Sequence, residues 1–222
     1  MNTKIIVVCN QKGGSGKTSL SMLVGGTLAL RKHKTLIVDA DPQGTATRWA
    51  ASAEDEAPFP AAIAGLSAAG SKLHREVKKF VGEYEFIVID CPPAVDSPVP
   101  QSALMVSDLA LIPIVPSPPD LWAGRGIKAL VDNVSSINET LLARLVANMV
   151  QTQTTLGKDS LDILNDFGIP LANSKLGLRS VYREAALYGS TVHVFGAKAG
   201  KAIAEVDALT DEVLQILGDN PE

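Results

Sequence analysis

Hydrophobic residues along the chain fall into short runs that alternate with longer, amphipathic stretches. The runs are rich in β-branched residues and predict strands buried on both faces, at Ile5–Cys9, Thr35–Asp39, Phe86–Asp90, Leu109–Val115 and Leu142–Val150. The stretches between them have helical spacing and enough length for crossover connections, at Lys17–Arg31, Lys72–Val81, Val99–Val106, Ala123–Ile137 and Thr155–Phe167. This alternation indicates an α/β fold in which helices flank a doubly wound, mostly parallel sheet.

Two regions depart from this alternation. The segment Ala50–Gly70 is rich in Ala, Glu and Pro and has weak periodicity, so we expect it to cover the surface. After Gly168 the pattern becomes mostly helical and ends in Ala202–Leu217, whose apolar positions indicate packing against the sheet. A chain of 222 residues with 46% hydrophobic composition can bury one substantial core, so we expect a single domain over residues 1–222.

The pattern also favours a cytoplasmic protein. No stretch reaches the roughly 18 uninterrupted apolar residues of a membrane helix. Met1 leads almost directly into the first predicted strand, without a segment typical of a signal peptide. Cys9 and Cys91 stand at or just past the ends of apolar runs, where small buried residues are common, so we assign them no chemistry.

Positive charge is concentrated in one late part of the chain. The formal net charge of −4 argues against indiscriminate coating of nucleic acid. Between Ala172 and Ile203, however, one anion, Glu184, stands against five cations: Lys175, Arg179, Arg183, Lys198 and Lys201. We predict that these cations make salt-sensitive, sequence-independent contacts to DNA phosphates. The alternative for each of them is a solvated position on a helix face.

The motif with the clearest chemistry is Gln-Lys-Gly-Gly-Ser-Gly-Lys-Thr at residues 11–18, which follows a predicted strand and opens a predicted helix. Glycines let backbone N–H groups turn towards phosphate oxygens, and the helix presents the positive end of its dipole. In this arrangement Lys17 reaches the terminal phosphates and Thr18 offers its hydroxyl to Mg²⁺. The predicted nucleotide-binding residues are Lys12, Gly13, Gly14, Ser15, Gly16, Lys17, Thr18 and Ser19. The alternative is a glycine-rich structural turn.

Carboxylates close two further predicted strands. Asp39 and Asp41 end the strand that begins at Thr35, and Asp90 ends the strand that begins at Phe86. Parallel strands have their carboxyl ends at one edge of the sheet, where ligands bind, so we expect these acids beside the glycine-rich loop. Mg²⁺ sheds its hydration reluctantly, so Asp90 is expected to hold the ion through water. For Asp39 and Asp41 the alternative is helix capping.

The glycine-rich motif departs from the general pattern G-x-x-x-x-G-K-[ST], because Gln11 occupies the position of the first glycine. The run Lys-Gly-Gly-x-Gly-Lys-Thr at residues 12–18 resembles the deviant Walker A motif of the ParA/MinD family of P-loop ATPases. The sequence Asp-x-Asp-Pro-Gln-Gly at residues 39–44 resembles the first switch motif of that family, and the apolar run ending in Asp90 resembles its Walker B motif. The resemblance spans Lys4 to about Leu217 and implies the P-loop NTPase fold.

The resemblance also implies roles for individual residues. Lys12 is expected to reach across a dimer interface to the partner's nucleotide, the alternative being a solvated loop lysine. Asp41 is expected to orient the attacking water, and Asp39 to help hold the Mg²⁺ shell or the switch. Asn148 is expected to pair with adenine, the alternative being a strand-end turn. The predicted catalytic residues are Lys12, Lys17 and Asp41, and the predicted metal-binding residues are Thr18, Asp39, Asp41 and Asp90.

Other branches of this family should leave traces that the sequence lacks. A MinD-like protein should end in a basic amphipathic helix, whereas residues 217–222 read Leu-Gly-Asp-Asn-Pro-Glu, which an anionic bilayer repels. An iron protein needs paired loop cysteines, whereas Cys9 falls inside the first predicted strand. The strand start at Lys4 leaves no room for an N-terminal helix-turn-helix domain. The DNA-associated branch remains, and Leu176–Ala185 resembles the ParA stretch that contributes to the DNA-binding face.

The resemblance therefore implies a small ParA-type protein that positions a cargo. It would be an Mg²⁺-dependent ATPase that forms a homodimer with ATP and binds non-specific DNA of the nucleoid, without a membrane. A cargo adaptor would stimulate its hydrolysis of ATP, and the cargo itself, a plasmid, a chromosome region or an assembly such as a carboxysome, stays open. The alternative is a metabolic P-loop enzyme that uses ATP to activate a small molecule. A nucleotide-binding scaffold without turnover is disfavoured, because every expected catalytic motif is present.

Overall fold

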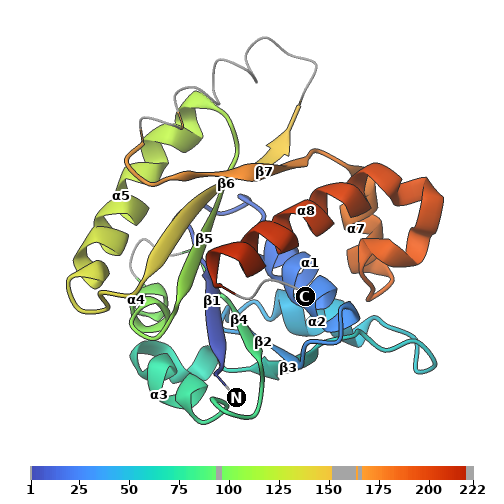
Figure 1. The fold of residues 1–222 in the computed structure, drawn as a ribbon, viewed down its shortest axis with the longest axis horizontal. Coiled ribbons are helices and arrows are strands. Elements are labelled where there is room, and N and C mark those ends of the chain that lie inside the picture. The colour runs from blue at the N-terminus through green and yellow to red at the C-terminus, as the bar shows by residue number, and fades with distance from the viewer. Residues whose placement is uncertain (1, 94–96, 152–163, 165–166, 219–222) are drawn as a thin grey trace.

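The computed structural model describes residues 2–93, 97–151, 164 and 167–218. Within these residues the chain forms a seven-stranded sheet in which every strand is parallel to its neighbours, in the order β3-β2-β4-β1-β5-β6-β7 (Figure 1). The strands are β1 Lys4–Val8, β2 Thr35–Asp39, β3 Ala62–Gly65, β4 Phe86–Asp90, β5 Leu109–Ile114, β6 Leu142–Val150 and β7 Leu171–Gly177. The helices are α1 Lys17–Leu30, α2 Thr45–Ala51, α3 Leu73–Lys78, α4 Val99–Leu104, α5 Pro118–Ser135, α7 Ser180–Leu187 and α8 Gly200–Ile216, with the 3₁₀ segments η1 Ser67–Lys72 and η2 Val192–Ala199.

A layer of helices covers each face of the sheet (Figure 1). Successive residues of a strand point to opposite faces, so Ile6 and Val8 of β1 pack with α1 and α8, whereas Ile5 and Val7 pack with the layer of α3, α4 and α5. Both faces of the central strands are therefore buried, which explains why their sequences are continuous apolar runs.

The strand register brings the motif-bearing ends of three strands to one edge of the sheet. β4 lies between β1 and β2, and its last residue, Asp90, is opposite both Val8 and Asp39. On its other side β1 pairs with β5, so the strand order reverses direction next to β1. Ligands bind at this point of an open parallel sheet. The loop that joins β1 to α1 lies there.

The predicted fold class is confirmed, with a sheet that is parallel throughout rather than mostly. β2, β4 and β6 have the predicted bounds. The sequence pattern predicts neither α2 nor β3, the edge strand inside the segment expected only to cover the surface. The prediction of mostly helical structure after Gly168 is wrong at β7. Of the helix predicted over Thr155–Phe167, only residues 164 and 167 are among those described.

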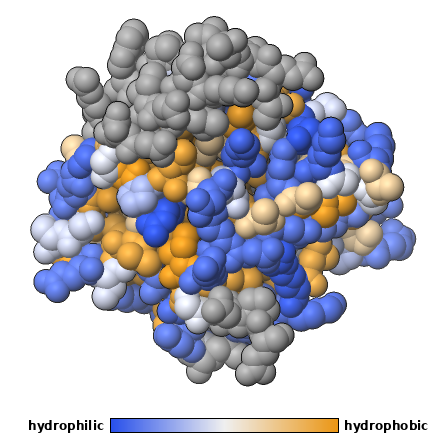
Figure 2. Space-filling model, turned by 45° about the horizontal axis from the view of Figure 1, so that its top comes forward, coloured by the Kyte–Doolittle hydropathy of each residue, from blue (hydrophilic) through white to orange (hydrophobic). Residues whose placement is uncertain are grey.

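Apolar side chains also reach the surface of the described residues. No helix in the described ranges is both long enough and apolar enough to cross a bilayer. On the face seen in Figure 2, hydrophobic residues reach the surface between hydrophilic ones, mostly on the side where α5 lies in Figure 1. Scattered apolar surface is normal in folded proteins, so only a cluster of exposed apolar side chains calls for an explanation.

Candidate nucleotide-binding site

The loop between β1 and α1 bends around open space. Gly14 and Gly16 have φ angles of 77° and 87°, in the left-handed region that favours glycine. A Cβ added at Gly16 would lie 2.2 Å from the side-chain nitrogen of Asn148, so no side chain fits there. A Cβ added at Gly13 or Gly14 would meet nothing within 4 Å. Gly13 and Gly14 thus leave open space beside the loop, here called the open glycine cradle. Gly16 permits close packing of the loop against Asn148.

Two asparagines fasten this loop to neighbouring strands. The buried Asn10 side chain donates to the carbonyl of Pro113 in β5 at 2.8 Å and accepts from the Lys12 N–H at 3.3 Å. Asn148 in β6 donates to the Ser15 carbonyl at 2.8 Å, and its oxygen accepts from the backbone N–H of Met149 at 2.9 Å. Asn10 is not among the predicted site residues; the signal for it is a polar residue directly after a buried strand.

Asn148 braces the glycine-rich loop from β6. Its amide nitrogen and oxygen are both hydrogen-bonded, and the side chain is buried beneath the loop. Pairing with adenine would require exchange of these hydrogen bonds, so the adenine contact stays a prediction.

Lys17 places a buried cation inside the loop. Its ammonium donates to the Lys12 carbonyl at 3.0 Å, and the residue is 6% exposed. Burial lowers the pKa of Lys17, while the carboxylates of Asp90 and Asp41 act in the opposite direction. The ammonium is thus held close to both carboxylates, where it can bind a phosphate oxygen.

Asp90 is a buried carboxylate that lacks part of its hydrogen bonding. Its Oδ1 accepts from the Ser21 hydroxyl at 3.1 Å, whereas its buried Oδ2 has no partner among the described residues. Burial, with a smaller contribution from the Asp39 carboxylate, raises the pKa of Asp90 to about 7, although the Thr18 and Ser21 hydroxyls and Lys17 oppose this shift. A cation, or a water bound to one, would satisfy the unpaired oxygen.

Asp39 organises the loop between β2 and α2. Its Oδ2 accepts from both the backbone N–H and the hydroxyl of Thr47 at 2.8 Å, and its Oδ1 accepts from the Asp41 N–H at 3.2 Å. Asp41, which is partly exposed, accepts from the Gln43 N–H at 2.9 Å. Asp39 therefore holds the loop that carries Asp41, and its role as a metal ligand stays a prediction.

The acidic groups fit a cation that arrives with a nucleotide. No group of three or more His, Cys, Asp or Glu side chains in the described part of the chain could hold a metal by itself. Mg²⁺ is usually held by one or two carboxylates together with water and substrate phosphates rather than by a protein cage. The unpaired oxygen of Asp90, the hydroxyl of Thr18 and the open cradle match that requirement. Ser15 is buried in the loop, and Lys12 and Ser19 are partly exposed.

Three of the five predicted DNA-contacting residues lie around a separate cavity. A cavity of about 540 Å³, here called the basic groove, opens between the beginnings of α7 and α8, and Arg179, Lys198 and Lys201 line it. Arg179 forms an ion pair with Glu205, and Lys198 lies 3.2 Å from the Glu184 carboxylate. The exposed residues among the predicted contacts are Lys175, Arg183, Lys198 and Lys201. The structure thus brings Arg179, Lys198 and Lys201 together. Their contacts to DNA stay predictions.

Comparison with known proteins decides the family. The model of the CobQ/CobB/MinD/ParA nucleotide-binding domain family matches residues 6–192, which include the glycine-rich loop, Asp39, Asp90 and Asn148. The chain belongs to this family. The prediction of the ParA/MinD family is therefore confirmed.

Individual relatives in this family match nearly the whole chain. The maintenance of carboxysome distribution protein A of Halothiobacillus neapolitanus is 31% identical over 209 residues, which cover 94% of this chain and 95% of the relative. The structure of a Cyanothece McdA variant in complex with ATP has a TM-score of 0.80 at 15% identity and covers 100% of this chain and 98% of its own. The septum site-determining protein MinD of Pyrococcus horikoshii, solved with Mg-ADP, has a TM-score of 0.75 at 22% identity and covers 97% and 98%. These likenesses establish the P-loop NTPase fold.

Proposed function

We propose that this protein is an Mg²⁺-dependent ATPase that uses ATP-controlled dimerisation to position a cargo on DNA. The observation that carries the proposal is the convergence of Lys17 and the unpaired Asp90 carboxylate on the open glycine cradle. The relative with 31% identity, whose name states a role in carboxysome distribution, supports the positioning part.

The residues divide the work of hydrolysis. The loop amides and Lys17 would bind the phosphates, Thr18 and Asp90 would hold Mg²⁺, and Asp41 would orient the attacking water. Mg²⁺ supplies charge neutralisation at the phosphates. The Asp39–Thr47 hydrogen bonds keep the Asp41 loop in place.

Dimerisation links the nucleotide to DNA binding. Lys12 stands in the same loop as Lys17 and would contact the nucleotide of a second copy, so that two chains associate only with ATP. The paired basic grooves would then bind DNA phosphates together, and because the salt dependence scales with the number of contacts, pairing raises the affinity steeply. The protein would act in the cytoplasm at the nucleoid, and a cargo adaptor would stimulate its hydrolysis.

The test is retention on a random-sequence duplex with ATP, ADP or no nucleotide, at low and moderate salt. We expect retention that requires ATP, does not depend on sequence and weakens with salt. Retention that is equal with ATP and ADP, or absent throughout, would contradict the proposal. Hydrolysis that responds to a metabolite and not to DNA would instead support a metabolic enzyme, the alternative activity for this fold.

A further inference from the structure

One side chain of the glycine-rich loop lies directly against the backbone of α5. A Cβ added at Gly126 would lie 1.9 Å from Oε1 of Gln11 and 2.6 Å from its Cδ, so the Gln11 carboxamide occupies the space of a side chain at that position. We call this space the α5 notch. Gly126 stands in the interior of α5, where glycine is less favourable than alanine by about 1 kcal/mol. The contact with Gln11, the residue at which the loop departs from the general phosphate-loop pattern, explains why no side chain is present there.

The residues on either side of Lys12 are supported by neighbouring strands. Before it, the buried Asn10 side chain donates to the Pro113 carbonyl of β5 at 2.8 Å and accepts from the Lys12 N–H at 3.3 Å. After it, Asn148 of β6 donates to the Ser15 carbonyl at 2.8 Å. The segment between these supports consists of Lys12 and two glycines, at which an added Cβ would meet nothing within 4 Å. This short segment is the part of the loop that has room to move.

The Lys12 carbonyl is held by a side chain that a nucleotide would engage. It accepts from the Lys17 ammonium at 3.0 Å and from the Ser15 hydroxyl at 3.3 Å. In the proposed function Lys17 binds a phosphate oxygen. A phosphate is a better acceptor for a buried ammonium than a carbonyl is, because it carries charge. Phosphate binding would therefore draw Lys17 away from the Lys12 carbonyl and release the peptide group that follows Lys12.

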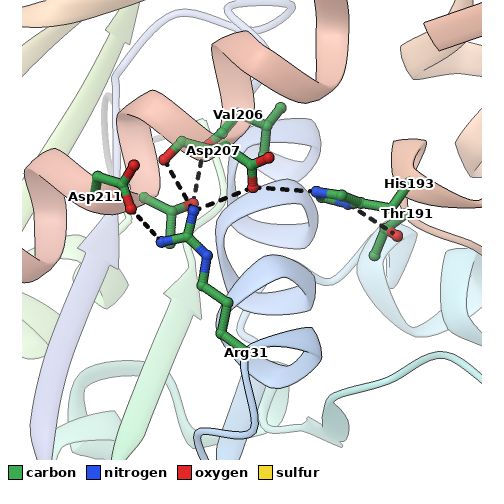
Figure 3. Close-up of polar contacts among 7 residues, drawn as sticks. Arg31, Thr191, His193, Val206, Asp207 and Asp211 are labelled. Atoms are coloured by element: carbon green, nitrogen blue, oxygen red, sulfur yellow. Dashed lines mark hydrogen bonds and ion pairs between the residues drawn. The ribbon is translucent and has the colours of Figure 1, made fainter. Parts of the chain in front are cut away.

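Helix α1, which begins at Lys17 directly after the loop, is fixed to the rest of the fold. Most of its residues are buried. Figure 3 shows that Arg31, just past its far end, binds Asp207 of α8 at 3.1 Å and also reaches Asp211 on the same helix. His193 of η2 contacts Asp207 at 3.2 Å, so the same network includes a third segment. A helix held in this way does not shift as a whole, and we expect the release of Lys12 to be confined to the loop.

We propose that Gln11 is a positioning residue for dimerisation: seated in the α5 notch, it holds the entry of the loop in place while phosphate binding releases Lys12 towards the nucleotide of a second copy. The inference rests on the proposed function, because it concerns the dimer that ATP controls. Gln11 does not touch the nucleotide in this scheme, and it sets the point from which Lys12 moves. Without this support the released segment adopts many orientations, and the entropy cost of ordering it weakens the dimer.

The first test is Gly126→Ala, whose added methyl group displaces the Gln11 carboxamide from the α5 notch. The substitution also favours the helix, so the melting temperature should stay the same or rise. We expect ATP affinity within about twofold of wild type, because Lys17 and the loop amides remain, but ATP-dependent dimerisation weakened about fivefold or more. Isothermal titration and sedimentation velocity with ATP and Mg²⁺ measure the two properties. The matched control is Gly200→Ala at the start of α8, where an added Cβ meets nothing within 4 Å and dimerisation should be unchanged.

Substitutions of Gln11 provide an independent check. Gln11→Ala should weaken dimerisation as Gly126→Ala does, and the double variant should be no weaker than either single variant, because all three lose the same contact. Gln11→Met, with an unbranched side chain of similar length, should fill the α5 notch and retain dimerisation. Effects that multiply in the double variant, or loss of dimerisation in Gln11→Met, would overturn the proposal.

The same measurements distinguish this inference from the proposed function. A wild-type chain that stays monomeric with ATP would refute the proposed function and this inference with it. A wild type that dimerises, together with Gly126→Ala that dimerises equally well, would contradict only the role of Gln11. The contact itself is measured without nucleotide by urea unfolding, in which the changes of midpoint for Gln11→Ala and Gly126→Ala should not add in the double variant. Additive changes would overturn the contact in the α5 notch.

Discussion

The phosphate loop and the basic groove both gather positive charge but hold it in different ways. In the loop, Lys17 is buried, donates to the Lys12 carbonyl and has a lowered pKa. In the groove, Lys201 is exposed, while Arg179 and Lys198 are already paired with carboxylates. The loop offers a fixed geometry that one ligand shape satisfies, whereas the groove offers solvated charges suited to an irregular polyanion and sensitive to salt.

Carboxylates show the same contrast. Glu205 accepts hydrogen bonds from Arg179, Tyr182 and the backbone N–H of Gly177. Burial alone would raise the pKa of Glu205, but these hydrogen bonds outweigh burial and lower it. Burial raises the pKa of Asp90 to about 7, and its Oδ2 has no hydrogen-bond partner among the described residues. The Glu205 carboxylate is thus satisfied without a ligand, whereas the Asp90 carboxylate is not.

The largest expected effect comes from removing the buried ammonium of Lys17. Lys17→Ala should weaken ATP binding about a hundredfold or more, because a buried, charge-assisted contact to phosphate is lost. Lys32→Ala, at an exposed position just after α1, should leave the affinity unchanged. Isothermal titration with ATP and Mg²⁺ measures both. Similar affinity of Lys17→Ala and wild type would show that the loop does not contact the terminal phosphates.

The next largest effect concerns hydrolysis without binding. Asp41→Ala should lower kcat about a hundredfold while ATP affinity and ATP-dependent DNA retention persist, because only the orientation of water is lost. Phosphate release and a gel shift measured on the same preparation separate the two properties. Asp55→Ala, which removes an exposed acid, is the matched control. Normal turnover by Asp41→Ala would contradict its catalytic role.

The unpaired carboxylate predicts a pH-dependent cost in stability. Asp90 keeps its proton up to about pH 7 when folded but only to about 3.8 when unfolded, so the folded state binds more protons between these values. Stability without nucleotide should therefore fall as pH rises through this window. Asp90→Asn should raise the free energy of unfolding by about 4 kcal/mol near pH 8 and by little near pH 4.

Urea unfolding in the presence of a chelator measures this difference. Asp55→Asn is the control, because that side chain is exposed and should give the same small change at both pH values. A stabilisation by Asp90→Asn that does not depend on pH would mean that the buried carboxylate is satisfied in solution. The same variant should bind ATP with Mg²⁺ more weakly than wild type, since it exchanges a carboxylate for a neutral amide.

The smallest effects belong to the basic groove. Lys201→Ala should weaken DNA retention about threefold and reduce the slope of log affinity against log salt by about 0.9, the value for one phosphate contact. Glu205→Gln should act in the opposite direction, because it releases Arg179 from its ion pair. Lys72→Ala, exposed on the opposite layer of helices, serves as the control. If Glu205→Gln weakens retention instead, Arg179 contributes by holding α7 in place.

The parts of the molecule that the sequence predicts are those with local physical causes. β2 and β4 are apolar because both of their faces are covered, so their bounds follow from composition alone. β7 instead contains three consecutive polar residues, Asn173, Ser174 and Lys175, and Glu212 of α8 accepts hydrogen bonds from the backbone N–H groups of Asn173 and Ser174. Because these partners lie almost forty residues later, at separations of 39 and 38, no local pattern reports them.

The same reasoning applies to the candidate site. The glycine-rich loop and the acids at strand ends are visible in sequence because phosphate and metal chemistry needs those residue types at that spacing. The hydrogen bond from Asn148 to Ser15 is not visible, because it depends on the order of strands in the sheet. The strand within Ala50–Gly70 is equally invisible in the sequence, because β3 has only four residues, Ala-Ile-Ala-Gly, and none of them is fully buried.

The contact between Asn148 and Ser15 joins residues 133 positions apart, and this has a consequence for biogenesis. Synthesis proceeds from the N-terminus, so the glycine-rich loop leaves the ribosome long before the strand that braces it. A nascent chain stalled before β6 therefore contains the full phosphate-binding motif and still lacks its support. Retention of such chains on immobilised ATP should begin only once β6 has emerged. ATP binding would then be a late step in co-translational folding.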